Sequence, residues 1–563
     1  MTSAFAIWSS SPLMREPRLL ALALARRFGR TNLLIQTEPP PTLRYTLPSA
    51  WDGALRTWFA DCRVLHAPPA EMVFGRLFPR HQLLSLCRGD CPRGEGLDRD
   101  IKLAWDFGRS HYAPLAAFIH GPACANEVAC NVCELMALTA SGPLWNSPMD
   151  VALRATNWLA ADALLSGALG RAVGPAWPGI LWKHFQTIWG RMEAYRVSSN
   201  HYLSNLLGLV LLGSVFPKND LAMRALALAR REWPRAILSQ TYKDGGAYEG
   251  SIPYHAFVTE MALVARLLDP VPWPEQATKR LHAMVDIIRS HRTAGGELPL
   301  VGDDDSGRVL AVDHGSGTGR ADALLSLAAR AGYRGASESP VFFPASGWWT
   351  ARRAGWFVHA EFGGVGFHGI GAHAHDDDFS LWVEHRGVPL FIDPGSYLYT
   401  PDQQARNEFR SAHRHTTVRL LNPGSAPGVL NAQGVFEWRG RIEPLPAQIK
   451  GAASCSIRDG IITRDIEVDE NELIVRDQCS GGGNAWWFFH LHPSLRHHTT
   501  DEGLVMEANG MRWRLSSRPA IRMEPTAAGF APCYGTCCPS VVYQGHCRTN
   551  GDLSVTWRLD VLC

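Results

Sequence analysis

The sequence has little net charge and no long apolar run. Its 55 Lys and Arg residues are almost balanced by 53 Asp and Glu residues, so it lacks the strong basic excess of a dedicated nucleic-acid-binding protein. No segment reaches the roughly 18 consecutive apolar residues that a membrane-spanning helix requires. We therefore expect a soluble protein with no nucleic-acid partner and no membrane partner.

The N-terminal part lacks a recognisable secretion signal. The apolar stretch at residues 19–25 has arginines on both sides and no small-residue cleavage site after it. This pattern is more typical of a buried helix than of a signal peptide. It favours a cytoplasmic location, with a periplasmic location as the alternative if the start of the sequence is truncated.

The cysteines do not form an obvious disulfide framework, because thirteen is an odd number. Cys130 and Cys133 form an isolated C-x-x-C motif. A second group near the C-terminus could hold zinc or a disulfide: Cys533, Cys537, Cys538 and Cys547. We prefer the interpretation that all these thiols are reduced and incidental.

The periodicity of the apolar residues changes once along the chain. From about residue 100 to 330 they recur at helical spacing, as at Phe257, Met261 and Val264. After residues 332–340 apolar and polar residues alternate, which predicts strands. Many strands without intervening helices indicate an antiparallel sandwich.

The chain of 563 residues has room for two to four domains, and the change of pattern predicts a multidomain α+β protein. Residues 1–95 are expected to be an N-terminal extension packed on the first domain. Residues 96–335 are expected to form a helical domain, and residues 345–563 an antiparallel β-sandwich.

Polar clusters interrupt the otherwise apolar helical sequence, and each costs free energy to bury without a partner or a purpose. The first cluster, at residues 198–202, places Asn200 and His201 directly before an apolar helix. A serine can cap that helix, but capping does not explain two adjacent mediocre helix formers. The second cluster, at residues 245–255, is a glycine-rich entry that puts Tyr254 at a helix start, where a tyrosine taken alone is more often a packing residue than a catalyst.

A third cluster is rich in histidine and aspartate. His373 and His375 alternate, so on a strand both would point to one face. The next predicted strand ends at Asp393, and His415 lies where another begins. Two histidines and one carboxylate on neighbouring strands are a plausible zinc-binding set, and a hydrogen-bonded polar patch explains them equally well.

Five ordered blocks carry these clusters: SSNHYLSNLLGL, GGAYEGSIPYHAF, PLVGDDDSGR, HAHDDDFSLWVEHRGVPLFIDPGSY and FRSAHRHTTV. Together they resemble the heparinase II/III family of polysaccharide lyases. An earlier block, DIKLAWDFGRSHY, resembles that family's K-x-x-W-E-x-x-R block, although Asp106 stands where the family has Glu. The resemblance covers about residues 95–420; beyond it only the β character agrees.

The resemblance implies an incomplete (α/α) toroid followed by an antiparallel β-sandwich, with the active site in the cleft between them. It implies that Asn200 and His201 neutralise a uronate carboxylate. Tyr254 would act as base and acid, and His373 would complete the site. Further substrate contacts are expected from five residues of the same blocks: Arg109, Glu249, His255, Tyr397 and Arg410.

The zinc site that some members of this family have would fall on His375, Asp393 and His415. His413 competes with His415 for the last place, and we prefer His415 because of the Thr-Thr-Val that follows it. We expect such a zinc ion, or a similar divalent ion, to be structural. No organic cofactor is expected.

The expected reaction is β-elimination on a uronate-containing polysaccharide or oligosaccharide, such as a glycosaminoglycan, alginate or exopolysaccharide, giving 4,5-unsaturated uronate ends. A phenol with a pKa of about 10 is a poor base at pH 7. We therefore expect cationic neighbours to lower the pKa of Tyr254; the candidates are His201, His255, His373 and Arg109.

Three alternative functions could use the same fold. A uronate C5-epimerase would remove the same proton without cleaving the chain, and a non-catalytic polysaccharide-binding protein would keep only the fold. A glycoside hydrolase would need two carboxylates, which Asp303, Asp304 and Asp305 could offer, but their block matches the lyase family's own loop. The preferred partner is an acidic saccharide. The particular polysaccharide, endo or exo action and the oligomeric state, for which a homodimer is one option, stay open.

Overall fold

The structure is a computed structural model that describes residues 12, 43–74, 76–89, 97, 100–138, 142–333, 342–432, 435–436, 438, 440–441, 443–451 and 453–562. The apolar stretch at residues 19–25 lies outside the described residues. The chain divides into two compact units. The first comprises residues 1–241, 256–285 and 307–335, and the second comprises residues 242–255, 286–306 and 336–563.

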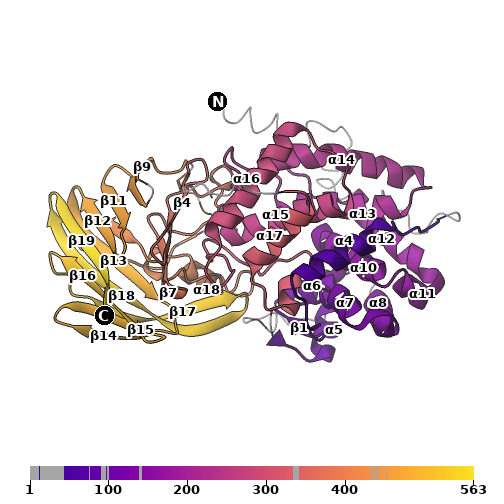
Figure 1. Cartoon of the computed structure of the whole chain (residues 1–563), viewed down its shortest axis with the longest axis horizontal. Helices are drawn as coiled ribbons and strands as arrows, with labels where there is room; N and C mark the ends of the chain where they lie inside the picture. The colour runs from indigo at the N-terminus through magenta and orange to yellow at the C-terminus, as the bar shows by residue number, and fades with distance from the viewer. Residues whose placement is uncertain are drawn as a thin grey trace. The chain divides into compact units, whose positions relative to one another are not determined.

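The first unit is helical (Figure 1). Its helices are α4 (Ala50–Asp61), α5 (Arg80–Arg88), α6 (Ile101–Arg109), α7 (Tyr112–His120), η3 (Gly121–Cys124), α8 (Ala125–Leu138), α9 (Pro143–Asn146), α10 (Pro148–Leu164), α11 (Ala168–Val173), η4 (Gly174–Ala176), α12 (Trp177–Gly190), α13 (Asn200–Val215), α14 (Asp220–Gln240), η5 (Val312–Gly315) and α17 (Arg320–Arg330), with a short hairpin of β1 (Met72–Val73) and β2 (Arg76–Leu77). Helices α15 (Ile252–Leu268) and α16 (Glu275–His291) each contribute residues to both units.

Helix α10 forms the centre of the helical unit. Every one of its residues is buried, and it packs against α4, α6, α7, α12 and α13. Ser147 caps the helix by accepting a hydrogen bond from the Asp150 amide, and Pro148 occupies the first turn, where its missing N–H has no cost. A helix that is buried on all sides can only exist inside a shell of other helices.

The second unit contains two antiparallel sheets (Figure 1). Its strands are β3 (Phe342–Phe343), β4 (Trp348–Arg353), β5 (Trp356–Glu361), β6 (Leu381–His385), β7 (Val388–Phe391), β8 (Val418–Leu421), β9 (Ala447–Gly451), β10 (Ser454–Arg458), β11 (Ile462–Val468), β12 (Glu472–Cys479), β13 (Gly482–Leu491), β14 (Arg496–Thr500), β15 (Gly503–Ala508), β16 (Met511–Arg518), β17 (Glu524–Cys533), β18 (Thr536–Asn550) and β19 (Leu553–Leu562). Three short helices lie between strands: η6 (Phe367–Gly369), α18 (Gln403–Phe409) and η7 (Ala412–Arg414).

The strands are ordered β14-β15-β16-β19-β12-β11-β10-β9 in one sheet and β17-β18-β13-β7-β6-β5-β4-β3 in the other, and β8 pairs with β13. Alternate residues of both sheets fill a common hydrophobic core, as Trp487 of β13 and Trp557 of β19 do. Asn509 and Gly510 join β15 and β16 with positive φ angles of 51° and 76°, as the sequence predicted for a tight hairpin.

The predicted fold class is confirmed: a helical N-terminal region precedes antiparallel β-sheets. Two differences from the sequence-based expectation concern the site. Residues 242–255 and 286–306, which fall in the predicted helical domain, group with the sheets. His373 and His375 do not lie on a strand but in the loop between β5 and β6.

Two further expectations concern membrane-spanning helices and the state of the cysteines. Within the described ranges, no helix is both long and apolar enough to cross a bilayer. Cys130 and Cys133 of the predicted C-x-x-C motif are free thiols.

The sandwich core contains a buried ion pair. Arg464 donates to both carboxylate oxygens of Asp477 at 2.7 and 2.8 Å, and the indole nitrogen of Trp487 donates to the same carboxylate at 2.8 Å. Both charged side chains are almost completely buried. Arg464 also donates to the carbonyl of Phe379 at 2.6 Å, so its charge is compensated inside the core by this carbonyl and by Asp477.

We expect Arg464→Met to lower the free energy of unfolding by about 3–5 kcal/mol, because it leaves the Asp477 charge buried without a counter-ion. The matched control is Arg476→Met, which breaks an exposed pair with Glu467 and should cost less than about 1 kcal/mol. Urea unfolding followed by tryptophan fluorescence measures both. Equal losses in the two variants would contradict the expectation.

Candidate active site and metal-binding cluster

Three loops of the second unit meet at the candidate site. The amide of Asp303 donates to the carbonyl of His373 at 2.9 Å. The hydroxyl of Ser251 donates to the carbonyl of Asp303 at 2.6 Å, and the amide of Ile252 donates to the carbonyl of Val301 at 3.0 Å. These bonds fix the start of α15, the loop after α16 and the loop before β6 to one another.

Glycines allow these loops to approach so closely. Gly302 has a φ of +74°, and a Cβ at this position would lie 2.7 Å from the carbonyl oxygen of Gly250. Gly366 has a φ of +66°, and its Cβ would lie 2.4 Å from the carbonyl oxygen of Tyr248. Only glycine avoids both the backbone strain and the clash.

The carboxylate of Asp303 is the centre of the hydrogen-bond network. Arg406 of α18 donates to its two oxygens at 2.9 and 2.6 Å. Oδ2 also lies 3.0 Å from Nδ1 of His373, and Oδ1 lies 3.1 Å from Nε2 of His375. Burial alone would raise the pKa of Asp303, but Arg406 and the two histidines hold it well below its usual value. Asp303 is therefore a buried, ionised carboxylate.

His373 lies between aromatic and acidic neighbours. Its ring stacks on that of Tyr254, with centroids 3.8 Å apart and an interplanar angle of 17°. Its Nε2, on the side away from Asp303, lies 3.5 Å from Oε2 of Glu249. The predicted catalytic pair of Tyr254 and His373 is thus brought together, with a carboxylate on either side of the imidazole.

The expectation that cationic neighbours lower the pKa of Tyr254 is wrong. Burial raises its pKa well above the usual value, and the charges of Asp305, Asp303 and Glu249 raise it further. The sequence placed histidines near this tyrosine but did not show that carboxylates surround it. In this arrangement Tyr254 holds its proton near pH 7.

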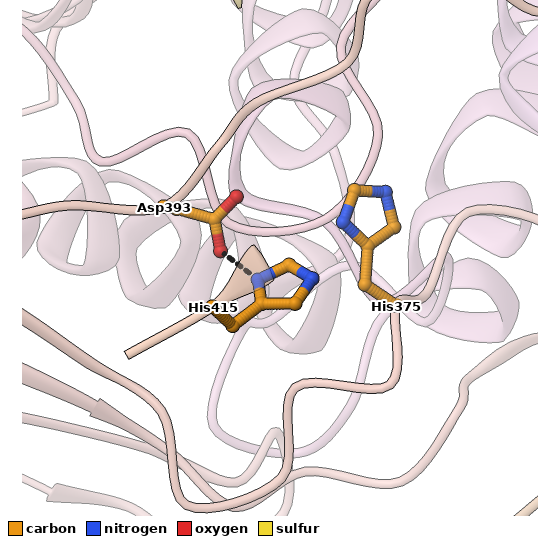
Figure 2. Close-up of side chains that lie close together, drawn as sticks. All are labelled: His375, Asp393 and His415. Carbon is orange, nitrogen blue, oxygen red and sulfur yellow. Dashed lines mark hydrogen bonds and ion pairs between the residues drawn. The ribbon is translucent and has the colours of Figure 1, made fainter. Parts of the chain in front are cut away.

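The predicted metal ligands also come together. His375, Asp393 and His415 each offer a ligand atom, and these atoms all lie within 4.8 Å of one another. Figure 2 shows the three side chains turned toward one another, with one ring nitrogen of His375 facing the other two. Nδ1 of His415 lies 2.9 Å from Oδ2 of Asp393.

The residues fit a metal ion. Nδ1 of His375 and Nε2 of His415 are buried and have no hydrogen-bond partner among the described residues. An unsatisfied buried polar atom costs about 1–3 kcal/mol, which a bound cation would remove at both nitrogens. The opposite nitrogen of each ring bonds a carboxylate, as is usual for metal-binding histidines. This group could therefore hold a metal.

The two histidines differ in their electrostatics. Burial lowers the pKa of His375 in spite of Asp303, so its imidazole is neutral near pH 7. Burial alone would also lower the pKa of His415, but Asp393 raises it above its usual value. His413, the alternative third ligand, lies outside the group and contacts Glu408 at 3.3 Å.

Three predicted site residues lie in the helical unit. Asn200 is the first residue of α13 and is buried, and Ser199 caps this helix by accepting from the His201 amide. Nδ1 of His201 lies 2.8 Å from Oε1 of Glu193. Arg109 is buried and donates to Asp150 at 2.7 Å. This pairing gives Arg109 a structural contact within the unit.

The other predicted substrate contacts differ in exposure. Arg410 is fully buried and donates to the carbonyls of Ala374 and Gly371, so it holds the histidine loop. His255 is also fully buried and accepts from the Ala247 amide at 3.2 Å. Glu249 is buried beside His373, and only Tyr397 is half-buried.

Sequence reasoning missed Arg406 and gave Asp303 only a minor place. The guanidinium of Arg406 lies over the Tyr399 ring at 4.2 Å while it binds Asp303. One signal was available: Arg406 and Arg410 are four residues apart, so they lie on one face of a helix. Both arginine side chains are buried, so their guanidinium groups need hydrogen-bond acceptors. These acceptors lie in loops that only the folded chain brings close.

Comparisons with known proteins concern the family of the C-terminal segment and the fold of the chain. Residues 335–554 match the family described as heparinase II/III-like, C-terminal. No curated protein sequence matches the chain.

Several solved structures share the fold over nearly the whole chain. A crystal structure of heparinase III has a TM-score of 0.64 at 12% identity and covers 99% of this chain and 93% of its own. A heparinase III gene product has a TM-score of 0.57 at 14% identity, covering 99% and 92%. The heparan sulfate lyase HepC from Pedobacter heparinus has a TM-score of 0.51 at 14% identity, covering 91% and 88%.

At these identities the likeness to solved structures concerns the fold. The family match covers the segment that carries His373 and the metal-binding cluster. The family resemblance found in the sequence blocks is thus confirmed: residues 335–554 match the heparinase II/III-like C-terminal domain, and the whole chain shares the fold of the solved heparinase III structures.

Proposed function

We propose that the protein is a polysaccharide lyase that cleaves uronate-containing polysaccharides or oligosaccharides by β-elimination. The observation that carries this proposal is the Tyr254–His373 pair, stacked at 3.8 Å. One member, Tyr254, has a pKa raised well above its usual value and therefore carries its phenolic proton near pH 7. The other presents a ring nitrogen on the side away from Asp303.

The first task of such an enzyme is to stabilise charge on the substrate. The C5 proton lies next to a carboxylate and is too weakly acidic to be removed while that carboxylate is fully charged. We assign Asn200 and His201 to this carboxylate, as the family resemblance implies. Donors that bind developing charge contribute roughly 2.7–4 kcal/mol each to transition-state stabilisation.

The second task is proton transfer. We assign the removal of the C5 proton to Nε2 of His373. The positive charge that then develops on the imidazole lies between Asp303 and Glu249, and both stabilise it. We assign the protonation of the leaving O4 to the Tyr254 hydroxyl, because its raised pKa keeps it protonated.

We further propose that the metal of the His375–Asp393–His415 group is zinc, since two imidazoles and one carboxylate suit this ion. When bound, zinc would link the loops that precede β6 and β8 with the end of β7. The carboxylate of the substrate is neutralised by Asn200 and His201 in this proposal. The ion therefore has a structural role here.

The substrate class follows from the chemistry and from the relatives. The relatives are named heparinase III and heparan sulfate lyase, and heparan sulfate is an acidic, uronate-containing polysaccharide. A glycosaminoglycan, alginate or an exopolysaccharide each presents the required uronate. Glycoside hydrolysis with Asp303 as the acid is not supported, because its carboxylate is held ionised in its pair with Arg406.

We expect the wild-type protein to form 4,5-unsaturated products from at least one of a panel of uronate polysaccharides, seen as a rise in ultraviolet absorbance. Tyr254→Phe should lower kcat about 100-fold or more, because it removes a general acid. Tyr543→Phe, which removes a hydroxyl that contacts His497, should leave kcat unchanged. C5-inverted sugars without absorbance would indicate an epimerase, and a Tyr254→Phe variant that kept about a tenth of wild-type kcat would exclude Tyr254 as the general acid.

We expect Asn200→Ala and His201→Ala to lower kcat more than they raise KM, since the substrate carboxylate carries more charge in the transition state than in the ground state. Steady-state kinetics on the active substrate measure both constants. A rise in KM with an unchanged kcat in both variants would assign these residues to binding alone.

We expect the purified protein to carry a bound divalent ion whose chelation lowers the melting temperature at least as much as it lowers activity. His375→Ala should lose the ion and melt at a lower temperature. The matched control His413→Ala should keep it, because His413 contacts Glu408 and lies outside the group. Metal analysis and thermal melts decide this: a metal-free wild type with an unaltered His375→Ala melt would contradict it.

A further inference from the structure

One carboxylate contacts both histidines of the loop that precedes β6. Oδ2 of Asp303 lies 3.0 Å from Nδ1 of His373, and Oδ1 lies 3.1 Å from Nε2 of His375. We propose that Asp303 is a positioning residue that fixes the ring tautomers of both histidines. This inference rests on the proposed function, because it assigns one ring to proton transfer and the other to metal binding.

The charge state of Asp303 sets the direction of both hydrogen bonds. Arg406, which is also buried, donates to each oxygen and holds the carboxylate in its ionised form. An ionised carboxylate can only accept hydrogen bonds. The two imidazole nitrogens that face it must therefore both carry a hydrogen.

The two rings are held by opposite nitrogens. His373 donates through Nδ1, which leaves Nε2, on the side of Glu249, as the nitrogen whose electron pair the proposed base needs. His375 donates through Nε2, so its Nδ1 keeps the electron pair that a metal ligand needs. This Nδ1 is the buried nitrogen without a partner among the described residues, and it faces Asp393 and His415 (Figure 2).

The opposite tautomer of either ring would place a hydrogen where the electron pair is required. His373 would then have no electron pair on Nε2 to accept a proton. His375 would have no electron pair on Nδ1 to donate to a metal ion. Ser396 donates to Oδ1 of Asp303 at 3.2 Å and, with Arg406 and the two histidines, is the fourth side chain that keeps the carboxylate in place. The same carboxylate thus prepares two different chemical tasks in neighbouring residues.

An amide cannot replace this carboxylate. The Asp303→Asn side chain has one acceptor oxygen and one donor nitrogen, so it can accept from His373 or from His375 but not from both. At least one ring must then change its tautomer or lose its hydrogen bond. Asp303→Asn is therefore a nearly isosteric test of the proposal.

The first measurement is neutron diffraction from the wild-type protein, which locates hydrogens directly. We expect one hydrogen on Nδ1 of His373 and one on Nε2 of His375. A hydrogen on Nε2 of His373 with a bare Nδ1 would overturn the proposal. This measurement needs no variant, so it decides even if Asp303→Asn does not fold.

The second measurement is the zinc affinity of Asp303→Asn, by competition with a chelator. We expect a loss of about 10–100-fold, as for other carboxylates that orient a metal-binding histidine. On an active substrate kcat should fall and KM should change little. The control is Asp244→Asn, whose carboxylate binds the amides of Ala345 and Ser346 and should leave zinc affinity unchanged.

The outcomes separate this inference from the proposed function. If the wild type cleaves no uronate polysaccharide, the proposed function fails, and the hydrogen positions and zinc affinity still decide the role of Asp303. If Asp303→Asn binds zinc and turns over substrate like the wild type, the positioning role fails and the lyase assignment stands.

Discussion

The ion pair between Asp303 and Arg406 is the contact on which the site depends. A charged pair taken out of water is stable only when its geometry is good and its remaining hydrogen-bonding groups are satisfied. Both oxygens of this carboxylate are shared between a guanidinium and an imidazole. The same contact therefore compensates a buried cation and orients the two histidines of the loop before β6.

Carboxylates, and not cations, set the direction of the pKa shift of Tyr254. Asp305, Asp303 and Glu249 all raise the pKa of Tyr254, whereas the charge of Arg406 is directed at Asp303. Negative groups around a phenol favour its protonated form. This distribution of charge keeps the phenol of Tyr254 protonated and leaves the imidazole of His373 as the proton acceptor in the proposed reaction.

Sequence patterns predicted the fold class, and the residues predicted as metal ligands come together in the structure, for reasons that are local. Period-two alternation marked β6 and β7, and the spacing of His373, His375, Asp393 and His415 marked the metal group. The loop placement of the two histidines was missed because alternation in sequence does not require a strand. The role of Arg406 was missed because its acceptor is 103 residues away, and such a pairing leaves no periodic signal.

The inclusion of residues 242–255 and 286–306 in the second unit has a consequence for how this protein can be divided. The family match begins at residue 335, which suggests a natural boundary for expression or recombination. A fragment cut there would keep Arg406, His373 and His375 but would lose Asp303, so a guanidinium buried in the intact chain would have no counter-ion. The segment that matches the family model is thus smaller than the compact unit that contains Asp303.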